Sequence, residues 1–475
     1  MAFVLFKTNC PSPLSNSKVA LMLFSVYSLL IGVAAEPKVA AKPVIDASIL
    51  DTSRYPQQLK QQNQPYTNSS GKMVGAYFVE WDTYEQNFQV ADIPAQNLTH
   101  VFYAFIPICG PNQSLKEADP QSFSKLAAQC AGKPDFTVVV HDKFAALERP
   151  YPGDTTKQQL KGIFAELYRL KKAHPDLKIL PSVGGWTLSD PLYSIGTNAQ
   201  ARATFVASII EMIQIYDFFD GVDIDWEFPG GGGLNPALGT EHDGAGFALL
   251  MQDLRQAMNS LSDKTGRTYQ LTAAMAGSVQ KLKLIDWKTA SPSMDYINLM
   301  TYDYYGEWDS VPGHHSALYA NPNSHRPGSS ADEAVQYLLS RKVPAGKISL
   351  GVAMYGRSWS NISHYKDNNP FTGTAGAGSN KTGGDYKRIA TQYLDNSQGA
   401  GAQGFNLVWD DKAKACALWN SAVGTLISFD CIASVQAKAN YVLQHNLGGV
   451  FAWELGGDNG QLLNAIHQGL GHQAK

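Results

Sequence analysis

Eight short apolar segments, several of them separated by amphipathic stretches, constrain the fold more than any other feature of the chain. The short segments have the length and the β-branched and aromatic content of buried strands. Strands that alternate with helices form βαβ units, and eight such repeats favour a closed (β/α)8 TIM barrel over an open doubly wound sheet. The expected strands are Met73–Val79, Leu98–Phe105, Leu177–Val183, Gly221–Trp226, Tyr269–Met275, Tyr296–Tyr302, Ile348–Met354 and Gly449–Trp453. The clearest expected helices are Phe164–Ala173, Ala201–Ile215, Gly246–Leu261 and Ala331–Leu339.

Two gaps between expected strands are too long for simple loops. Residues 107–155 follow the second strand, and residues 356–430 separate the seventh from the eighth. Structureless loops of the second length are uncommon, so we expect a small α+β insertion subdomain at 356–430 within a catalytic barrel that spans 71–475. Residues 36–70 are rich in Pro, Gln, Asn and Ser, which predicts a linker or an N-terminal arm.

The N-terminus has the pattern of an export signal. Lys7 and Lys18 precede the uncharged apolar run Val19–Val33, and a small-x-small cleavage site ends at Ala35. A signal peptide at 1–35 predicts a secreted, extracellular protein. The stretch before the apolar run is long for a signal, which leaves an uncleaved membrane anchor as the alternative. No later segment is long and apolar enough to span a bilayer, so we expect no membrane contact after the signal is removed.

The cysteines agree with export. Cys10 lies in the predicted signal, which leaves an even number in the mature chain: Cys109, Cys130, Cys416 and Cys431. An even number in a secreted chain predicts disulfides. Three connectivities are open, and the sequence-local pairs Cys109–Cys130 and Cys416–Cys431 are favoured.

Charge and motif content argue against several other classes of partner. The net charge of -3 gives no electrostatic reason to expect nucleic acid or an anionic membrane. The chain has no Cys-x-x-Cys or His-Glu-x-x-His pattern, and His314-His315 has no third ligand nearby in sequence, so we expect no metal. No cofactor is implied, and the chain is expected to be a monomer.

The segment Phe219–Pro229 carries the clearest chemical signal. Side chains alternate between the two faces of a strand. One face is apolar and suits packing under the outer helices: Val222, Ile224 and Trp226. The other face points into the barrel and carries only carboxylates: Asp223, Asp225 and Glu227. Inward carboxylates are costly unless they share protons or meet a polar ligand.

These carboxylates predict acid–base chemistry. Mutual repulsion is expected to raise at least one pKa and to keep one carboxyl protonated near neutral pH. Glu227 lies at the carboxyl end of its strand, where the active sites of barrels are found, so we expect it to be the general acid. The alternative is an edge strand with a solvated acidic face, which fits poorly with the apolar opposite face.

The run DGVDIDWE at 220–227 resembles the DxxDxDxE signature of family-18 glycoside hydrolases, the chitinases. Further matches lie at the ends of other expected strands: Ser182–Gly185 (SxGG), Met300–Asp303 (MxYD), Met354–Arg357 and Trp453-Glu454. The resemblance runs from about residue 71 to residue 475, and within the family it is greatest to the bacterial chitinase A group.

This resemblance implies a chitinase that hydrolyses β-1,4 bonds between N-acetylglucosamine units of chitin and chitooligosaccharides. The implied mechanism is substrate-assisted and retains the anomeric configuration. Glu227 is implied as the acid and base, and Asp225 as the group that orients the substrate acetamido group. Asp223 is implied to hold Asp225 and share its proton, and Tyr302 to donate a hydrogen bond to the acetamido group. Asp220 is expected to be structural.

The resemblance also implies a set of substrate-binding side chains. They are Tyr77, Trp81, Trp186, Met300, Asp303, Trp308, Arg357 and Trp453, with Trp453 as the floor under the cleaved sugar. The sequence departs from the chitinase A pattern in two places. Residues 36–70 are too short for its fibronectin-like domain, and Gly373–Gly384 has no Trp. Both departures argue against processive attack on crystalline chitin.

Two other functions are compatible with the same fold. A catalytically silent chitin-binding lectin typically lacks the acid, whereas this sequence retains Glu227. An endo-β-N-acetylglucosaminidase acting on N-glycans would not be expected to carry the long segment after the seventh strand, because that insertion would wall a groove suited to a linear polymer.

Overall fold

A computed structural model of the chain describes residues 55, 59–156, 158–321, 325–376, 383–394 and 401–475. The expected signal peptide at 1–35 and most of the expected arm at 36–70 lie outside the described residues. Within the described residues, no helix is both long and apolar enough to cross a membrane.

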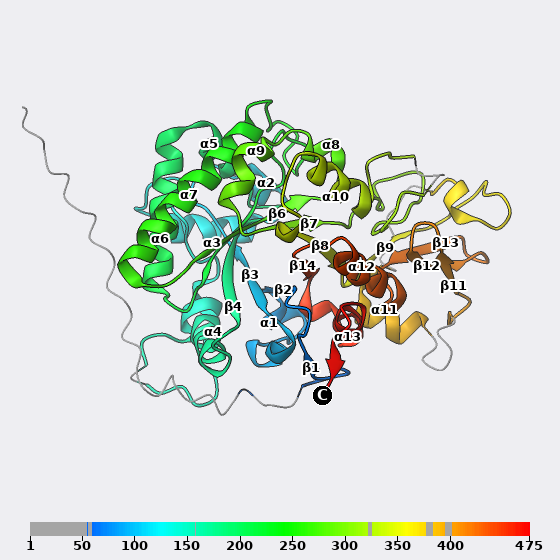
Figure 1. Cartoon of the computed structure of the whole chain (residues 1–475), viewed down its shortest axis with the longest axis horizontal. Coiled ribbons are helices and arrows are strands. Elements are labelled where there is room, and N and C mark those ends of the chain that lie inside the picture. The colour runs from blue at the N-terminus through cyan, green and yellow to red at the C-terminus, as the bar shows by residue number, and fades with distance from the viewer. Residues whose placement is uncertain (1–54, 56–58, 157, 322–324, 377–382, 395–400) are drawn as a thin grey trace, which may run out of the picture. The chain divides into compact units, whose positions relative to one another are not determined.

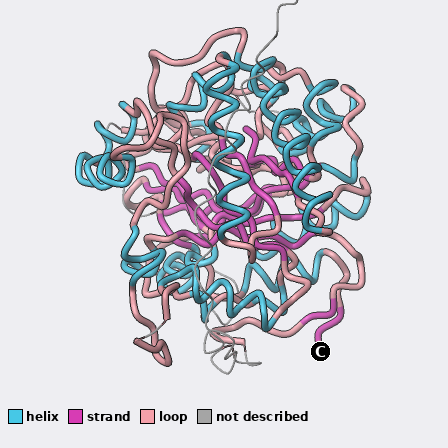
Figure 2. Tube along the Cα trace, turned by 90° about the vertical axis from the view of Figure 1, so that its left-hand side faces the viewer, coloured by secondary structure: helices cyan, strands magenta, loops and turns pink. Residues whose placement is uncertain are grey.

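Eight parallel strands close into a barrel, which confirms the (β/α)8 prediction. Their order around the barrel is β14-β2-β3-β4-β5-β6-β7-β8, so each strand pairs with its neighbours in sequence and the last closes on the first. The strands form the centre of the domain, and helices surround them (Figure 1, Figure 2). Their bounds are β2 Met73–Val79, β3 His100–Ile106, β4 Lys178–Gly184, β5 Gly221–Asp225, β6 Gln270–Ala276, β7 Tyr296–Met300, β8 Ile348–Ala353 and β14 Gly449–Trp453.

The observed strands differ from the expected ones by one or two residues at some ends. The expected strand Tyr296–Tyr302 ends at Met300. It ends there because the amide of Thr301 donates back to the carbonyl of Leu299 at 2.8 Å and leaves the sheet ladder. The residues after Met300 therefore belong to a loop, which frees their side chains for the mouth of the barrel.

The helices begin and end at recognisable capping residues. α10 begins after Ser330, whose Oγ accepts from the amide of Glu333 at 3.4 Å, and α7 ends at Gly266, which has a φ of 70°. The α-helices of the described residues are α1 Asp82–Glu85, α2 Gln113–Ala118, α3 Pro120–Cys130, α4 Gly162–Ala173, α5 Asp190–Thr197, α6 Ala199–Ile215, α7 Asp243–Thr265, α8 Val279–Leu282, α9 Trp287–Ala290, α10 Ala331–Ser340, α11 Tyr386–Tyr393, α12 Ile432–Gln444 and α13 Gln461–Gly469.

The long segment between β8 and β14 folds as an α+β insertion, as predicted. Its antiparallel sheet has the order β10-β9-β13-β12-β11, and α11 packs beside it (Figure 1). The strands are β9 Tyr355–Trp359, β10 Gly384–Asp385, β11 Asn406–Asp410, β12 Ala415–Asn420 and β13 Thr425–Phe429.

Both favoured disulfides are present. Cys109–Cys130 joins the loop after β3 to the end of α3, and Cys416–Cys431 joins β12 to the residue that caps α12. The local pairing is therefore confirmed.

The first and last described strands pair with each other. β1, Tyr66–Thr67, is antiparallel to β15, Gln473–Ala474. The Tyr66 ring also stacks on His467, with 4.7 Å between ring centroids. The contact fixes the segment before β2 against the segment after α13.

A fully buried lysine joins α12 to the loop after β7. Lys438 Nζ lies 2.7 Å from Asp430 Oδ2 and also donates to Ser316 Oγ. It further donates to the carbonyls of Gly351, at 3.1 Å, and Thr301, at 3.4 Å. Because Thr301 directly precedes Tyr302, this lysine anchors the start of a loop that carries predicted site residues.

Substitution of Lys438 by Met should lower the free energy of unfolding by about 3–5 kcal/mol, because it leaves the Asp430 carboxylate buried without its counter-ion. Urea unfolding followed by circular dichroism measures the loss. Lys143→Met is the matched control, since Lys143 pairs with Glu148 at an exposed site and should change stability little. Equal effects of the two substitutions would contradict the assignment of Lys438 as an anchor.

Candidate active site

Asp223 lies at the centre of the barrel and is fully buried. Tyr77 OH donates to its Oδ2 at 2.8 Å, and Ser182 Oγ donates to the same oxygen at 2.7 Å. Thr272 Oγ1 donates to Oδ1, and Asn298 Nδ2 approaches it at 3.5 Å. Burial raises the pKa of Asp223, while these hydrogen bonds act in the opposite direction. Donors from β2, β4, β6 and β7 thus fix one carboxyl group in place.

Asp225 is the next inward carboxyl on β5 and has few partners. Its Oδ1 is buried and has no hydrogen-bond partner among the described residues. Burial raises its pKa well above the ordinary value, and the charges of Glu227 and Asp223 raise it further. These shifts favour the protonated form of Asp225, and one of its oxygens has no partner in the described part of the chain.

Glu227 follows β5 at the mouth of the barrel, where most of its surface is covered. Burial raises its pKa to about 8, and the charge of Asp303 is the second cause. The sequence-based prediction attributed a raised pKa to repulsion between the strand's own carboxylates. Repulsion contributes at Asp225, but burial is the larger cause at both residues. At neutral pH Glu227 therefore holds a proton that it can transfer.

Glycines at the end of β4 allow β5 to lie this close. Gly184 has a φ of 109°, and a Cβ on it would collide with the carbonyl oxygen of Asp225. Gly185 has a φ of 95°, and its amide donates to the same carbonyl at 2.8 Å. The glycines of the SxGG element therefore bring the ends of two strands together beside the carboxylates.

Asp303 is held as a carboxylate by a paired arginine. Arg357 Nε lies 2.7 Å from its Oδ1 and Nη2 lies 2.9 Å from its Oδ2. Burial alone would raise the pKa of Asp303, but the nearby ring of His315, 3.7 Å away, and the hydrogen bonds and charge of Arg357 hold it well below its usual range. Asp303 comes from the loop after β7, so its negative charge faces Glu227 from another strand.

Aromatic rings from β2, β3 and β14 form a continuous surface. Trp453 stacks on Phe105, with 5.4 Å between centroids. Its ring centroid also lies 5.2 Å from that of Tyr77 and 6.4 Å from that of Trp81. Tyr77 is almost fully buried and its hydroxyl is engaged by Asp223, so it supports this surface from below. Trp81 is 39% exposed and offers its ring to solvent.

Two more of the predicted binding residues, Trp186 and Trp308, lie in the loops after β4 and β7. Trp186 follows β4 and lies 6.4 Å from Phe228, measured between ring centroids. Trp308 is 55% exposed, and the guanidinium of Arg357 lies 5.0 Å from its centroid. Exposed aromatic rings that follow β2, β4 and β7 suit a ligand that presents flat apolar faces.

Two predicted residues of the MxYD element pack in the barrel interior. Tyr302 and Met300 both belong to the apolar cluster that includes Trp453. The Tyr302 centroid lies 6.1 Å from that of Tyr355, and burial together with the charge of Asp225 raises its pKa well above the ordinary value. Tyr302 therefore keeps its hydroxyl proton and can act as a hydrogen-bond donor.

Interactions between strands link most of the predicted site residues, and the structure adds several that sequence reasoning missed. The additions with direct contacts are Thr272 and Asn298 on Asp223, Phe105 under Trp453, and His315 beside Asp303. Strand alternation on β6 and β7 could have indicated the first two, because both are polar residues on inward faces. Nothing local in the sequence marks Phe105, whereas His315 belongs to the pair considered above only as metal ligands.

No group of three or more His, Cys, Asp or Glu side chains suited to a metal ion occurs in the described part of the chain. His314 Nε2 instead lies 3.2 Å from Asp410 Oδ2 in the insertion. The chemistry that the geometry offers is proton transfer from Glu227, in a mouth lined by carboxyl groups and aromatic rings.

A parallel barrel with a protonated glutamic acid and a second carboxyl at the carboxyl end of one strand, flanked by exposed aromatic rings, has the construction of a glycoside hydrolase. The family model described as glycosyl hydrolases family 18 matches residues 73–458. The chain belongs to this family and is a glycoside hydrolase.

The relatives that resemble the chain are named chitinases. It is 41% identical to chitinase A of Pseudoalteromonas piscicida over 87% of its own length and 54% of that protein. It is 42% identical to the chitinase of Autographa californica nuclear polyhedrosis virus, over 83% of its own length and 72% of the viral protein. The chitinase ChiA74 structure from Bacillus thuringiensis has a TM-score of 0.74 and 32% identity, covering 84% of this chain and 69% of that one. The chain thus spans little more than half of the first of these relatives.

Proposed function

We propose that this protein is a chitinase that hydrolyses β-1,4 bonds between N-acetylglucosamine units of chitin and chitooligosaccharides. The observation that carries the proposal is the pairing of Glu227, whose pKa burial raises to about 8, with Asp225, whose buried Oδ1 has no hydrogen-bond partner among the described residues. The chitinase names of the relatives support the substrate class. The catalytic unit is the barrel at 71–475, with the insertion at 356–430 as part of it.

In the first step Glu227 donates its proton to the oxygen that bridges two sugars. The bond from that oxygen to the anomeric carbon breaks, and the leaving sugar departs as an alcohol. The acetamido carbonyl oxygen of the remaining sugar forms a bond to the anomeric carbon and gives a positively charged oxazolinium ring. Trp453 and its supporting rings lie under this sugar, and Asp303 contacts its polar edge.

Asp225 positions the reacting acetamido group. Its unpartnered Oδ1 accepts the acetamido N–H, and transfer of its own proton toward Asp223 leaves a negative charge beside the new positive ring. Burial raises the pKa of Asp223 and so favours its taking up this proton, although the hydrogen bonds that it accepts act in the opposite direction. Tyr302 donates to the acetamido carbonyl oxygen until that oxygen attacks.

In the second step Glu227, now a carboxylate, removes a proton from water. The water oxygen attacks the anomeric carbon from the face that the leaving sugar vacated, and the oxazolinium ring opens. Two inversions restore the starting configuration, so the new reducing end is the β-anomer.

Export and a monomeric state form part of the same proposal. Chitin is an extracellular polymer too large to cross a membrane, which agrees with the signal expected at 1–35. The barrel mouth is complete within one chain, since each group assigned a role belongs to residues 71–475. Size-exclusion chromatography of the culture supernatant tests both points.

The deciding experiment is hydrolysis of chitohexaose with the anomer of fresh product read by ¹H NMR. Predominance of the β-anomer supports the retaining mechanism, whereas the α-anomer would exclude it. Binding without cleavage would identify a lectin. Release of sugar from N-glycans, without cleavage of chitohexaose, would identify an endo-β-N-acetylglucosaminidase.

The rate should fall as the pH rises through about 8, because Glu227 must be protonated to act as the acid. The quantity to measure is kcat/KM for a chitooligosaccharide between pH 5 and pH 10, a range of about two to three pH units on either side of that pKa. Asp303→Asn removes a charge that raises the pKa of Glu227, so it should move this alkaline limb to lower pH. If the alkaline limb of the pH profile stays at the same pH in Asp303→Asn, Asp303 does not help to set the pKa of Glu227.

A further inference from the structure

An open cavity of about 450 Å³ lies outside the acidic centre, between the loop after β7 and the insertion sheet. Its volume is within the range of about 300–1,000 Å³ found for small-molecule sites. Tyr305, His314 and Ala317 are buried residues of its lining, and the loop Asp367–Phe371 and the end of β11 also contribute. None of the residues assigned a catalytic or binding role above lines it.

The cavity combines aromatic rings of different exposure. Trp409 on β11 is 40% exposed, and β11 is an edge strand of the insertion sheet. Tyr305 is buried, and the Phe371 ring lies 4.3 Å from His314, measured between centroids. An exposed indole next to a cavity offers a flat apolar face to a ligand.

The polar groups of the cavity are held in place before any ligand arrives. Asp410 accepts from His314 Nε2 at 3.2 Å and from Asn321 Nδ2 at 2.5 Å. Asn368 Oδ1 accepts from the indole of Trp419 at 3.1 Å, and Asn369 Oδ1 accepts from the amide of Phe371 at 3.0 Å. Fixed side chains lose little conformational entropy on binding, which favours recognition of a ligand.

The charges of the lining restrict the kind of ligand. The lining contains three carboxylates, Asp367, Asp410 and Asp411, but one lysine, Lys412, so the site disfavours anions. Amide and carboxylate groups beside aromatic rings are suited to a neutral ligand that has many hydroxyl or amide groups and an apolar ring face. An oligosaccharide of N-acetylglucosamine has these properties.

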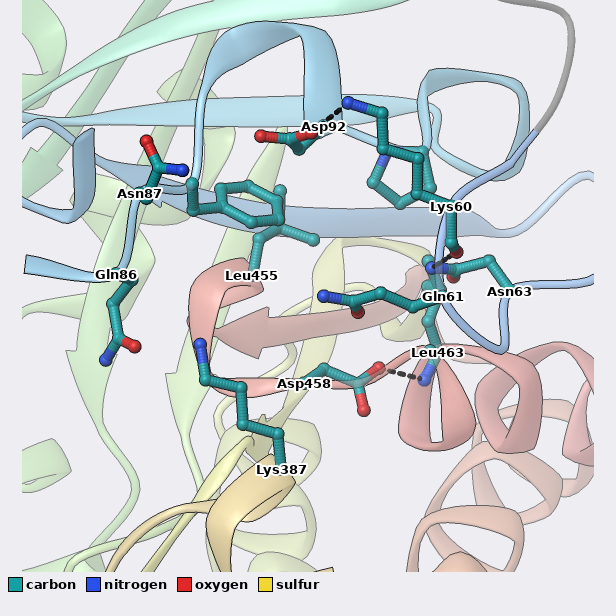
Figure 3. A pocket seen from close by; sticks show the side chains of 13 residues that line it. Lys60, Gln61, Asn63, Gln86, Asn87, Asp92, Lys387, Leu455, Asp458 and Leu463 are labelled. Atoms are coloured by element: carbon teal, nitrogen blue, oxygen red, sulfur yellow. Dashed lines mark hydrogen bonds and ion pairs between the residues drawn. The ribbon is translucent and has the colours of Figure 1, made fainter. Parts of the chain in front are cut away.

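A second cavity, of about 160 Å³, provides a contrast (Figure 3). There the charged groups are already engaged. Lys60 pairs with Asp92, Asp458 accepts from the amide of Leu463 at 3.0 Å, and Lys387 donates to the carbonyl of Gly456 at 2.7 Å. The volume of this second cavity is below the range of about 300–1,000 Å³ found for small-molecule sites, so the first cavity is the better candidate for a ligand.

We propose that the cavity beside Trp409 is a second binding site for N-acetylglucosamine oligomers, separate from the catalytic mouth. The proposal rests on the proposed function, because it assigns the same class of sugar. Tyr305 lies two residues after Asp303 and three before Trp308, so both sites share the loop after β7. A second site of this kind holds the enzyme on a polymer while the barrel mouth acts on one chain.

Isothermal titration of chitotriose tests the proposal in a Glu227→Gln background, where the sugar is bound without being cut. We expect a tight site in the barrel mouth and a weaker site in the cavity. Trp409→Ala should weaken only the second site, by at least about tenfold, because it removes the exposed ring. The matched control is Leu407→Ala, an exposed residue of the same strand that does not line the cavity, which should retain both sites.

Incorporation of 5-fluorotryptophan locates the weaker site by ¹⁹F NMR. The Trp409 resonance is assigned by its loss in Trp409→Phe. Under the proposal it shifts at higher chitotriose concentrations than the resonances of Trp186 and Trp308. A Trp409 resonance that does not move at saturation overturns the proposal even if the wild type hydrolyses chitin. If the Trp409 resonance shifts but the wild-type protein cuts no chitooligosaccharide, the proposed function is overturned and the binding site stands.

Discussion

Replacement of Glu227 by Gln is expected to reduce kcat for chitooligosaccharide hydrolysis by roughly 10²–10⁴-fold, with KM nearly unchanged. Gln has the size and shape of the protonated acid but cannot transfer a proton to the bridging oxygen. The carboxyl is suited to this transfer because burial and the charge of Asp303 raise its pKa to about 8. Steady-state kinetics on chitotetraose measures the loss.

Glu241→Gln is the matched control for this substitution. This variant makes the same change from carboxyl to amide at a side chain that is 90% exposed. The kcat of Glu241→Gln should therefore equal that of the wild type. Thermal unfolding of both variants shows whether either has lost its fold. A folded Glu227→Gln enzyme with near-normal kcat would mean that another group is the acid.

Replacement of Asp225 by Asn is expected to lower kcat by roughly 10²–10³-fold, the scale for removal of one electrostatic contact to a transition state. The amide cannot become negative as the oxazolinium ring forms, so the positive charge develops in a buried site without its counter-ion. Pre-steady-state kinetics should show that the first step, not the second, is slowed.

The comparison variant for Asp225→Asn is Asp220→Asn. Asp220 directly precedes the strand that carries Asp225. Asp220 lies at the other end of β5, where it accepts from Lys171 Nζ at 2.8 Å and from the amide of Ile179 at 2.9 Å. Its loss should lower the free energy of unfolding and leave kcat nearly unchanged. Equal losses of kcat in the two variants would show that the carboxylates of this strand act through stability alone.

The alternation of side chains along β5 was enough to predict which carboxyls face inward. Trp226 is fully buried among outer helices and packs edge-on against Tyr193, with 5.3 Å between centroids, whereas Asp223 is buried inside the barrel. The two-residue alternation of apolar and acidic side chains is a local property of the sequence, which is why this part of the site was predictable.

Contacts between distant strands were not predictable in the same way. The residue whose charge raises the pKa of Glu227 is Asp303, from the loop after β7, and sequence reasoning attributed that effect to neighbours on β5. Phe105 under Trp453 is a similar case, because it is one apolar residue among many at the end of a strand. Such pairings depend on how the barrel closes, which no local pattern records.

Binding residues and packing residues were also hard to distinguish by type. Tyr77 was expected to contact substrate, yet its hydroxyl donates to Asp223 and its ring is almost completely covered. Trp81, by contrast, keeps 39% of its surface exposed. An aromatic residue at a strand end is compatible with either outcome, and only its neighbours decide.

The pairing of β1 with β15 makes the barrel a candidate for circular permutation. Tyr66 lies opposite Ala474, and the amide of Lys475 donates to the carbonyl of Pro65 at 2.8 Å, so a short glycine-rich linker can join the two segments. New termini can then be opened in an exposed turn, such as residues 421–423 between β12 and β13, which would place a fused polypeptide beside the insertion sheet.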